Sequence, residues 1–386
     1  MDLAWHRQDL LQLQLEPWAA ALGKLGGGHF ATEFDRQWQP LAPPTNELTL
    51  QSRLVFAMVM GHEFTQDGRY LELARRGTDF LLQRFRDPLH GGFFNKVAAN
   101  GDVIDPGKRT YGHAFVLLAL SHMARVTREP AYAVAALQCW REIRRHFRDG
   151  EGGFRAEAQR DFAPNLLWRS QNPTMHLFEA LLALVRATRD TSAMQGATEL
   201  GNFVIGKLLQ DQGEHGARIP EIFTEHWLPV VDKERGGHID LGHQFEWSHL
   251  LSTPEGLGLP AAWPTAGQRL LQYALHAGYD NIDGGCYNRT FADGVFDRDK
   301  YFWQQAECLS ALLVAARRDG RPELWRRYEQ TLVMVKGQFI DPEFAGWRYT
   351  TKSLCDRGRC GNQRLDPYHM ISMHLRALQG AQAAKA

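Results

Sequence analysis

A polar or ionisable residue recurs along the chain every 60 to 67 residues, each time near the start of an apolar segment with the character of a helix. The six positions are Arg53, His113, His176, His243, Glu307 and His369. A fixed period indicates one supersecondary unit that is built several times and buries its core by packing on its neighbours. We therefore expect six helical hairpins, each of which brings a functional side chain to a common point.

The spacing of apolar residues predicts twelve helices in six pairs, and no long alternating strand pattern competes with it. In each pair, the helix that carries the polar residue is apolar on most sides, which is typical of a helix buried all round, while its partner is apolar on one face. Six buried helices inside six half-exposed helices form an (α/α)6 barrel, so the predicted fold class is all-α. An irregular α-solenoid is the alternative, but it would not need the polar residues at the same helix end. The predicted helices are 3–22, 46–62, 67–85, 109–127, 129–147, 171–188, 192–210, 242–253, 263–279, 299–318, 321–339 and 366–380.

Short segments of glycine and aromatic residues lie between the hairpins. Glycine permits a tight turn and a close backbone approach there, and the aromatic side chain closes the barrel end. No linker rich in glycine, serine or proline divides the chain, so we expect a single domain over residues 1–386. The segments are Gly91-Gly92-Phe93-Phe94, Gly152-Gly153-Phe154, Gly284-Gly285-Cys286-Tyr287 and Gly346-Trp347-Arg348-Tyr349.

The charges of the chain are balanced, with 44 Lys and Arg against 44 Asp and Glu. Such a chain has no net field that would attract nucleic acid or an anionic membrane. The N-terminus lacks the apolar core of a signal peptide, and the apolar stretches are too short to span a bilayer. The cysteines are scattered, and their spacing matches neither a CxxC pair nor a zinc motif. We therefore expect a reduced, cytoplasmic protein, either a monomer or a homodimer.

Two of the polar clusters have the spacing His-x-x-Glu, which places both side chains on one face of a helix. In GHQFEWSHLL this spacing joins His243 to Glu246, and in NPTMHLFEALLAL it joins His176 to Glu179. A carboxylate beside an imidazole orients the ring and stabilises its charged form. We expect Glu246 to support His243 in this way. The alternative is a capped core histidine beside a surface glutamate.

The other polar clusters open further helices. His369 follows Asp366-Pro367, which suits a helix start, so it falls in the first turn, where the helix dipole disfavours the protonated imidazole. A neutral imidazole near pH 7 can act as a base. Arg53 is a lone cation on an apolar helix, and it needs either a structural carboxylate or an anion that develops during a reaction. Two more helices open with aromatic and polar side chains, Tyr111 with His113 and Trp303 with Glu307.

The sequence contains no HExxH motif, no glycine-rich phosphate loop and no GxSxG nucleophile elbow. We therefore expect neither a metal nor another cofactor. Paired histidines with an arginine and aromatic side chains suit proton transfer next to a carbonyl: the histidines exchange protons, the arginine stabilises the enolate oxygen, and the aromatics stack on sugar carbons. The rivals are a glycoside hydrolase, which needs two carboxylates beside the scissile bond, and a binding module with a vestigial site.

At these residues the chain resembles the N-acylglucosamine 2-epimerase superfamily, which includes cellobiose 2-epimerases, mannose isomerases and sulfoquinovose isomerase. The similarity runs from about Trp5 to Leu378. It rests on the segments KRTYGHAFVLLAL, NPTMHLFEALLAL, EIFTEHWLPV, GHQFEWSHLL, the helix with Trp303 and Glu307, and DPYH. The resemblance implies an (α/α)6 barrel that works without an essential metal.

The resemblance also implies roles for residues that match the family by position. His243 and His369 would be the two acid/base histidines, Glu246 would support the first of them, and Arg53 would lie near the reacting oxygen. A sugar pocket is implied as well, and we add to it His113, the neighbour of Tyr111. The predicted substrate-binding residues are Tyr111, His113, Asn172, His176, Trp303 and Glu307.

The pair Glu246-Trp247 resembles the mannose isomerase and sulfoquinovose isomerase branch, because the epimerases tend to have a small residue after that glutamate. Leu365 offers no cation or amide for a sulfonate, so a mannose isomerase is the leading prediction. D-mannose or D-lyxose would become its ketose through a cis-enediolate, with His369 moving the proton between C2 and C1 and His243 opening the ring. The reverse assignment of the two histidines fits the same residues. The alternative is a 2-epimerase that acts on N-acylglucosamine, glucose/mannose or cellobiose.

Overall fold

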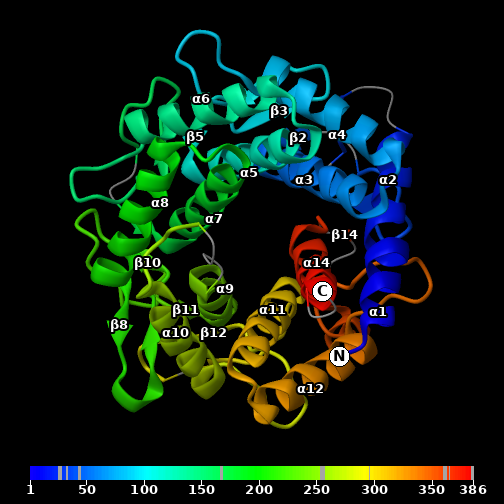
Figure 1. The fold of residues 1–386 in the computed structure, drawn as a ribbon, viewed down its shortest axis with the longest axis vertical. Coiled ribbons are helices and arrows are strands. Elements are labelled where there is room, and N and C mark those ends of the chain that lie inside the picture. Colours follow the sequence, from blue (N-terminus) through cyan, green and yellow to red (C-terminus); the bar gives the residue numbers. More distant parts are fainter. Residues whose placement is uncertain are drawn as a thin grey trace.

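Six inner helices form a closed ring in the computed structural model, which describes residues 1–24, 28–31, 34–41, 45–165, 168–252, 257–294, 296–359, 363–364 and 366–383 (Figure 1). Each inner helix packs against the next, and the last packs against the first. Within these helices most residues are buried, as expected of helices that are apolar on most sides. The inner helices are α3 (Leu48–Thr65), α5 (Thr110–Thr127), α7 (Gln171–Thr188), α9 (Leu241–Ser252), α11 (Phe302–Asp319) and α14 (Tyr368–Ala383).

Five outer helices each pack on the inner helix that precedes them in the chain. In α6, for example, Ala136, Cys139, Trp140 and Ile143 are buried at the i, i+3, i+4, i+7 spacing of a one-sided apolar helix. The outer helices are α4 (Gly68–Phe80), α6 (Pro130–His146), α8 (Thr191–Phe203), α10 (Trp263–Ala277) and α12 (Pro322–Gln338), and π-helical turns extend α4 over Leu81–Phe85 and α8 over Val204–Leu208.

The connections contain strands of only two or three residues, which pair in small antiparallel sheets at the barrel ends. The three-stranded sheets have the orders β2-β3-β4 and β11-β12-β13, and β7 pairs with β10. The strands are β1 (Phe34–Asp35), β2 (Thr45–Glu47), β3 (Lys96–Ala98), β4 (Val103–Asp105), β5 (Lys108–Arg109), β6 (Glu157–Ala158), β7 (Arg169–Ser170), β8 (Gln210–Asp211), β9 (Ala217–Arg218), β10 (Ile222–Phe223), β11 (Ile239–Asp240), β12 (Arg289–Thr290), β13 (Phe296–Asp297) and β14 (Gln363–Arg364); short helical turns lie at Gly213–His215, Lys352–Leu354 (α13) and Cys355–Arg359.

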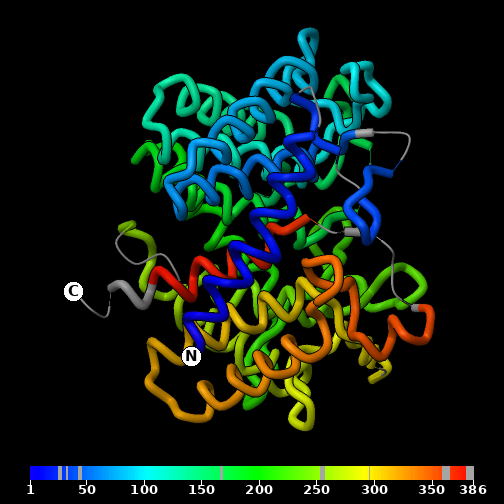
Figure 2. Tube along the Cα trace, turned by 90° about the vertical axis from the view of Figure 1, so that its right-hand side faces the viewer, coloured from blue at the N-terminus to red at the C-terminus, as the bar shows by residue number. Residues whose placement is uncertain are grey.

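The two ends of the chain together form the sixth hairpin. The N-terminal segment runs as α1 (Leu3–Gln8), a π-helical stretch (Asp9–Leu15) and α2 (Glu16–Gly23). It lies beside α14, so that the blue and red ends of the chain are side by side in Figure 2. The barrel is therefore closed by contacts between residues more than 300 positions apart in the sequence.

A fully buried polar cluster makes this closing contact. Asp9 Oδ2 lies 2.7 Å from His374 Nε2, and the other nitrogen of that ring lies 2.8 Å from His6 Nδ1. Trp347 Nε1 donates to Asp9 at 3.1 Å, and His6 Nε2 lies 2.5 Å from the hydroxyl oxygen of Tyr328. Because these groups have left water, each depends on its partner in the cluster.

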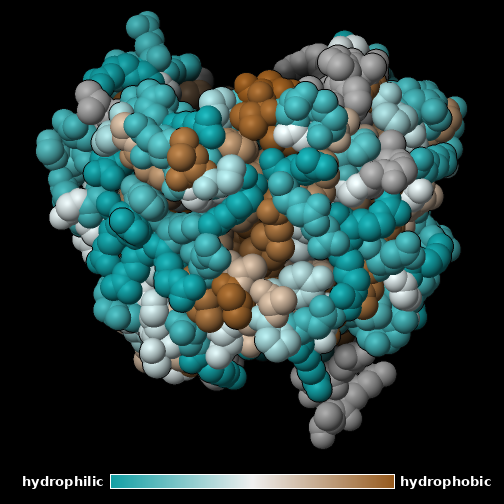
Figure 3. All heavy atoms as spheres, turned by 90° about the horizontal axis from the view of Figure 1, so that it is seen from above, coloured by the Kyte–Doolittle hydropathy of each residue, from teal (hydrophilic) through white to brown (hydrophobic). Residues whose placement is uncertain are grey.

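The structure confirms the (α/α)6 barrel, and its closed ring rules out the solenoid alternative. Among the described helices, none is both long and apolar enough to cross a membrane. The side of the barrel in Figure 3 is mostly hydrophilic, with small and separate hydrophobic areas, which is normal for a protein surface.

The expectation of a fully reduced chain is wrong at one cysteine. Cys355 is disulfide-bonded, whereas Cys139, Cys286 and Cys308 are free and buried. Burial raises the pKa of the three free thiols, so they are protonated and unreactive at neutral pH. Cys360 lies outside the described residues.

We predict that Asp9→Ala destabilises the barrel by about 3–5 kcal/mol, because it leaves His374 and Trp347 buried without their acceptor. Equilibrium urea denaturation, followed by circular dichroism, measures this change. The matched control is Lys336→Ala, which removes the surface ion pair between Lys336 and Asp2 at the same junction and should cost at most about 1 kcal/mol. Equal effects of the two substitutions would show that the cluster does not hold the ends together.

Candidate active site

The functional side chains come from two levels of the inner helices. One set occupies the second or third residue of its helix: Tyr111, Asn172, His243, Trp303 and His369. The other set occupies the sixth residue: Arg53, His176, Glu246 and Glu307. Residues three or four apart lie on one helix face. Both sets therefore face the barrel axis, one below the other.

A cavity of about 390 Å³ opens at this end of the barrel. Seven of the predicted site residues line it, together with five residues that were not predicted. Glu246 and Glu307 do not line the cavity but contact residues that do, and His113 lies elsewhere. The predicted residues of the lining are Arg53, Tyr111, Asn172, His176, His243, Trp303 and His369; the others are Glu221, His238, Asp240, Arg289 and Phe302.

The structure does not bring His113 to the cavity. It is the fourth residue of α5, and two residues beyond Tyr111 a helix has turned by about 200°. Its Nδ1 lies 2.7 Å from the carbonyl oxygen of Arg109, and its Nε2 accepts from the Phe93 N–H at 3.0 Å. Burial lowers the pKa of His113 to about 4, so this ring is neutral and both of its nitrogens are occupied.

Three other inner helices carry a buried glutamine at the same fourth position. Gln305 bonds to the backbone of Cys286 on both sides of its amide, as His113 bonds to the backbone of Phe93. A glycine precedes both anchored residues, Gly92 before Phe93 and Gly285 before Cys286, and it lets the backbone come this close to the side chain. Gly92 has a φ of +64°, and a Cβ there would lie 2.8 Å from His113 Nε2. His113 therefore anchors a glycine-aromatic loop. The equivalent residues are Gln51, Gln244 and Gln305.

His243 pairs with Glu221, a residue that the spacing analysis missed. His243 Nδ1 lies 2.8 Å from Glu221 Oε2, and both side chains are buried. Burial disfavours the charged imidazole, but Glu221 and Asp240 outweigh this effect and raise the pKa of His243 to about 9. Burial also opposes the charge of Glu221, but His243 outweighs it and lowers the pKa of Glu221 to about 2. At neutral pH the pair is an imidazolium and a carboxylate.

The expected contact between Glu246 and His243 is therefore replaced. The ring of His243 turns toward the segment before β10, where Glu221 lies, while Glu246 points to the barrel axis. Glu221 belongs to EIFTEHWLPV, which carries the family resemblance, but no helical spacing links it to His243.

Trp247 has a part in the same arrangement. Its Nε1 donates to Gln171 Oε1 at 2.6 Å, which turns the amide nitrogen of Gln171 toward Glu221 Oε2, also at 2.6 Å. Trp247 thus lies behind the site, where its indole orients Gln171, and Gln171 in turn orients Glu221. Its link to His243 through Gln171 and Glu221 consists of three hydrogen bonds.

His369 pairs with Glu307 in the same manner, and a third residue completes the chain. Glu307 Oε1 lies 2.7 Å from His369 Nδ1, and Glu307 Oε2 lies 2.6 Å from His249 Nε2. Burial opposes the charge of Glu307, but the two imidazoles outweigh it and hold the pKa of Glu307 well below its usual range. Glu307, predicted to bind substrate, instead orients His369 from below, and its second histidine was not predicted.

Trp303 lies between the two histidines. Its ring centroid is 4.9 Å from that of His243 and 5.4 Å from that of His369. With each Nδ1 facing a glutamate, the Nε2 atoms of both imidazoles remain for a ligand in the cavity. An indole flanked by two oriented imidazoles is a platform for a sugar ring, whose C–H faces stack on aromatic side chains.

Arg53 is a buried cation with partners on several sides. It donates to Asp366 Oδ2 at 3.2 Å and to the hydroxyl of Tyr111 at 2.7 Å, and its guanidinium lies over the rings of Phe115 and Tyr368. Burial opposes its charge, but the neighbouring oxygens outweigh this and raise the pKa of Arg53 further. Arg53 therefore stays charged and brings a fixed positive charge to the cavity wall.

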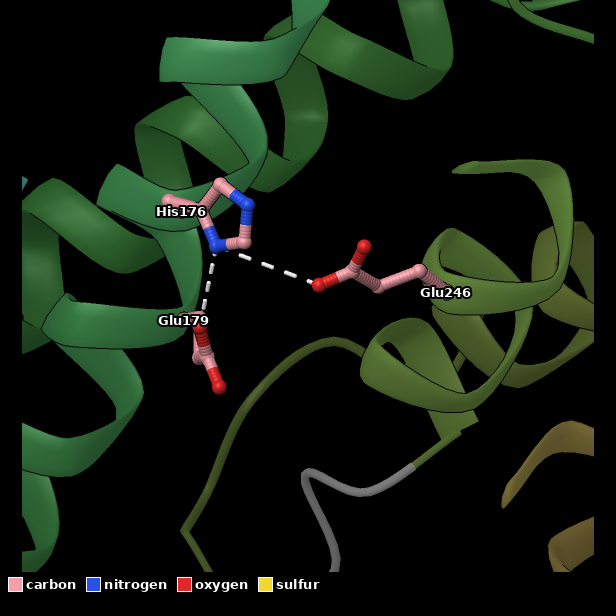
Figure 4. Close-up of side chains that lie close together, drawn as sticks. All are labelled: His176, Glu179 and Glu246. Carbon is pink, nitrogen blue, oxygen red and sulfur yellow. Dashed lines mark hydrogen bonds and ion pairs between the residues drawn. The ribbon is translucent and has the colours of Figure 1, made fainter. Parts of the chain in front are cut away.

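Glu246 extends from α9 toward His176 and Glu179 on α7 (Figure 4). Its Oε1 lies 3.8 Å from His176 Nδ1, while its Oε2 has no hydrogen-bond partner among the described residues. Burial, together with Glu307 and Glu179, raises the pKa of Glu246 well above its ordinary value. Burial also lowers the pKa of His176 to about 4, so this ring is neutral at pH 7.

Two groups of side chains are close enough to coordinate a cation: His176, Glu179 and Glu246, and Glu246, Glu307 and His369. Their atoms already pair with one another, since Glu179 faces His176 Nδ1 at 3.2 Å and Glu307 faces His369 Nδ1. A metal ligand must be deprotonated, and the raised pKa of Glu246, which both groups share, opposes this. The donor set thus suits proton exchange better than a resident cation.

The sequence model of the N-acylglucosamine 2-epimerase family (GlcNAc 2-epimerase) matches residues 28–370. The chain belongs to this family. A D-mannose isomerase from Thermobifida fusca is 30% identical over 297 residues, which cover 72% of this chain and 70% of that protein. A cellobiose 2-epimerase from Eubacterium cellulosolvens is 27% identical over 320 residues, 76% of each protein. The crystal structure of a D-mannose isomerase superposes with a TM-score of 0.86 at 22% identity and covers 98% of both chains.

We predict that Glu221→Gln lowers the pKa of His243 from about 9, because the largest charge that opposes the effect of burial is lost and the more distant Asp240 remains. NMR titration of the protein labelled in its imidazole rings measures this pKa. Glu179→Gln is the matched control: it removes a carboxylate paired with His176 and leaves the pair of Glu221 and His243 intact. An unchanged titration in Glu221→Gln would contradict the pairing.

Proposed function

We propose that this protein is a metal-independent aldose–ketose isomerase that interconverts D-mannose, or D-lyxose, and its ketose, D-fructose or D-xylulose. The observation that carries the proposal is the pair of glutamate-oriented histidines that flank Trp303 in one cavity. Such a pair can donate a proton at one oxygen and remove one at the neighbouring carbon. The family and the relatives named D-mannose isomerase support the choice of reaction and sugar.

His243 supplies the acid. Because its pKa is raised to about 9, it carries a proton on Nε2 at neutral pH. It donates this proton to the ring oxygen O5 and takes up the proton that the O1 hydroxyl loses. The O5–C1 bond breaks and an open-chain aldose forms. The carboxylate of Glu221 stabilises the imidazolium before this step and keeps the ring oriented after it.

His369 supplies the base. Its Nε2 takes the proton from C2 as the carbonyl oxygen O1 gains negative charge, and a cis-enediolate forms. The same imidazole returns the proton to C1, while His243 gives its proton to O1 and takes the proton of the O2 hydroxyl, so that O2 becomes the ketose carbonyl. Glu307 stabilises the transient imidazolium, and Arg53 faces the developing oxyanion with a charge fixed beforehand by Asp366 and Tyr111.

Two further groups suit the binding of sugar hydroxyls. Asn172 lines the cavity and has a buried Oδ1 with no hydrogen-bond partner among the described residues, so it can accept from a sugar hydroxyl. The neutral His176 also lines the cavity. A free monosaccharide is the proposed partner, and we propose that the protein acts in the cytoplasm as a monomer or homodimer. Its balanced charge, which offers no field to attract nucleic acid or an anionic membrane, supports this choice of partner.

A 2-epimerase is the second candidate. It needs the same two histidines but returns the proton to C2 from the opposite face. The arrangement of His243 and His369 on different helices, with Trp303 between them, favours this candidate, because a second acid is then available at the same sugar. A glycoside hydrolase is not favoured: Glu179, Glu246 and Glu307 all lie outside the cavity lining and face histidines.

We predict that the purified protein converts D-mannose in D₂O to D-fructose, read by NMR, and that dialysis against EDTA leaves the rate unchanged. His243→Ala and His369→Ala should each lower kcat by at least about 10²–10⁴-fold, because each removes one proton-transfer group. His226→Ala, at a surface histidine that is 69% exposed, is the control and should keep full activity. Glucose with deuterium at C2 and no fructose would identify the epimerase; no conversion of mannose or lyxose would refute the isomerase.

We predict that the rate falls as pH rises through about 9. The pKa of His243 is raised above its ordinary 6.5, so the acid form is complete below that range and is lost above about pH 9. In Glu221→Gln the falling limb should move to a lower pH. Measuring kcat between pH 6 and 10 gives the falling limb of the wild type and that of Glu221→Gln. If the two limbs coincide, a group other than His243 sets the loss of activity at high pH.

A further inference from the structure

The cavity contains a second arginine besides Arg53. Arg289 lies in β12, lines the cavity and is partly buried. Its Nε is buried without a hydrogen-bond partner, and Arg289 forms no ion pair with any residue that the structure describes. A guanidinium that has lost part of its water and found no acceptor is costly, so its position at a cavity wall points to an acceptor supplied by the ligand.

The neighbouring carboxylates are committed elsewhere, which explains why Arg289 is unpaired. Its cross-strand partners are Asp240 on β11 and Asp297 on β13. Asp240 Oδ1 accepts from the His243 N–H at the start of α9 and from Gln304. Asp297 accepts from Asn288 at 2.6 Å and from the Asp299 N–H at 3.1 Å. Neither carboxylate is within ion-pair distance of Arg289.

The position of Arg289 indicates which part of a sugar it would meet. β12 lies across the ring from α3, which carries Arg53 (Figure 1). It pairs with β11, and α9 with His243 follows directly. In the proposed reaction Arg53 faces the oxygens of C1 and C2, and His243 faces O5. The carbon next to O5 and away from C1 is C5, which carries the hydroxymethyl group of a hexose.

We propose that Arg289 is a specificity-determining residue that binds the C6 hydroxymethyl end of the hexose. This inference rests on the proposed function for the orientation of the sugar. The guanidinium donates to the C6 hydroxyl, which gives a bound hexose one charged hydrogen bond that a pentose cannot form. The enzyme then prefers D-mannose to D-lyxose, which has the same configuration at C2 to C4 but lacks C6.

The experiment compares Arg289→Met with the wild type on both sugars. Because one hydrogen bond from a charged group is lost, kcat/KM for D-mannose should fall about 10- to 100-fold, while that for D-lyxose should change less than about threefold. The matched control is Arg298→Met, at an exposed arginine beyond the same hairpin that stacks on Tyr287 and does not line the cavity. This control should leave kcat/KM unchanged for both sugars.

A binding measurement separates this inference from the proposed reaction. D-mannitol and D-arabinitol are the reduced forms of the two sugars, lack the carbonyl and cannot isomerise. Calorimetric titration should show that Arg289→Met raises the Kd for D-mannitol about 10-fold or more and leaves the Kd for D-arabinitol unchanged. Equal weakening of both alditols, or none, overturns the role of Arg289 even if mannose is isomerised. If Arg289→Met weakens the binding of D-mannitol alone but the wild type converts neither sugar, the proposed reaction is refuted and the role of Arg289 in binding stands.

Discussion

All six inner helices begin at the same end of the barrel, and the site depends on this constraint. Residues of the first turns then converge, and the sixth residues form a second level beneath them. The apolar character of these helices forces any polar side chain on the axis to find a partner on another helix. Glu307 on α11 meets His369 on α14 and His249 on α9 in this way. The N-terminal segment packs on α14 through the buried cluster around Asp9 and so completes the sixth hairpin.

The two histidines differ because their surroundings differ. His243 lies near two carboxylates, Glu221 and Asp240, and keeps its proton. His369 shares a single glutamate with His249, since Glu307 divides its two oxygens between them. Burial and its acidic neighbours raise the pKa of the nearby Glu246, which disfavours a further negative charge beside His369. The carboxylates around His243 thus differ in number from the single one beside His369, which suits the two different roles proposed for these histidines, ring opening and proton transfer at carbon.

Much of this arrangement could be predicted from the sequence. The 60- to 67-residue period and the apolar patterns predicted the twelve helices and the barrel, because the packing of a repeated hairpin follows from local patterns. Residues on the axis-facing turns, such as Arg53, His176 and His369, were predicted to converge and do. Helix geometry could also have separated His113 from the rest, since it lies two residues beyond Tyr111 and faces the opposite side.

The pairing of the proposed catalytic groups could not be predicted in the same way. The spacing of His243 and Glu246 suggested a pair, but the carboxylate that meets His243 is Glu221, in the loop before β10. Nothing local specifies a contact between a loop and a helix that depends on the course of the chain between them. The same holds for His249 and Arg289, whose positions relative to Glu307 and to the cavity appear only once the ring is closed.

The most direct test of the account is the fate of the hydrogen at C2. D-mannose carrying deuterium at C2 would be converted in ordinary water, and the fructose formed would be examined at C1 by NMR. A single imidazole that removes and returns the proton on one face predicts deuterium at one of the two prochiral positions of C1 only, in less than full yield, because part exchanges with water. Deuterium spread over both positions, or transferred completely in every turnover as in a hydride shift, would contradict a single histidine base.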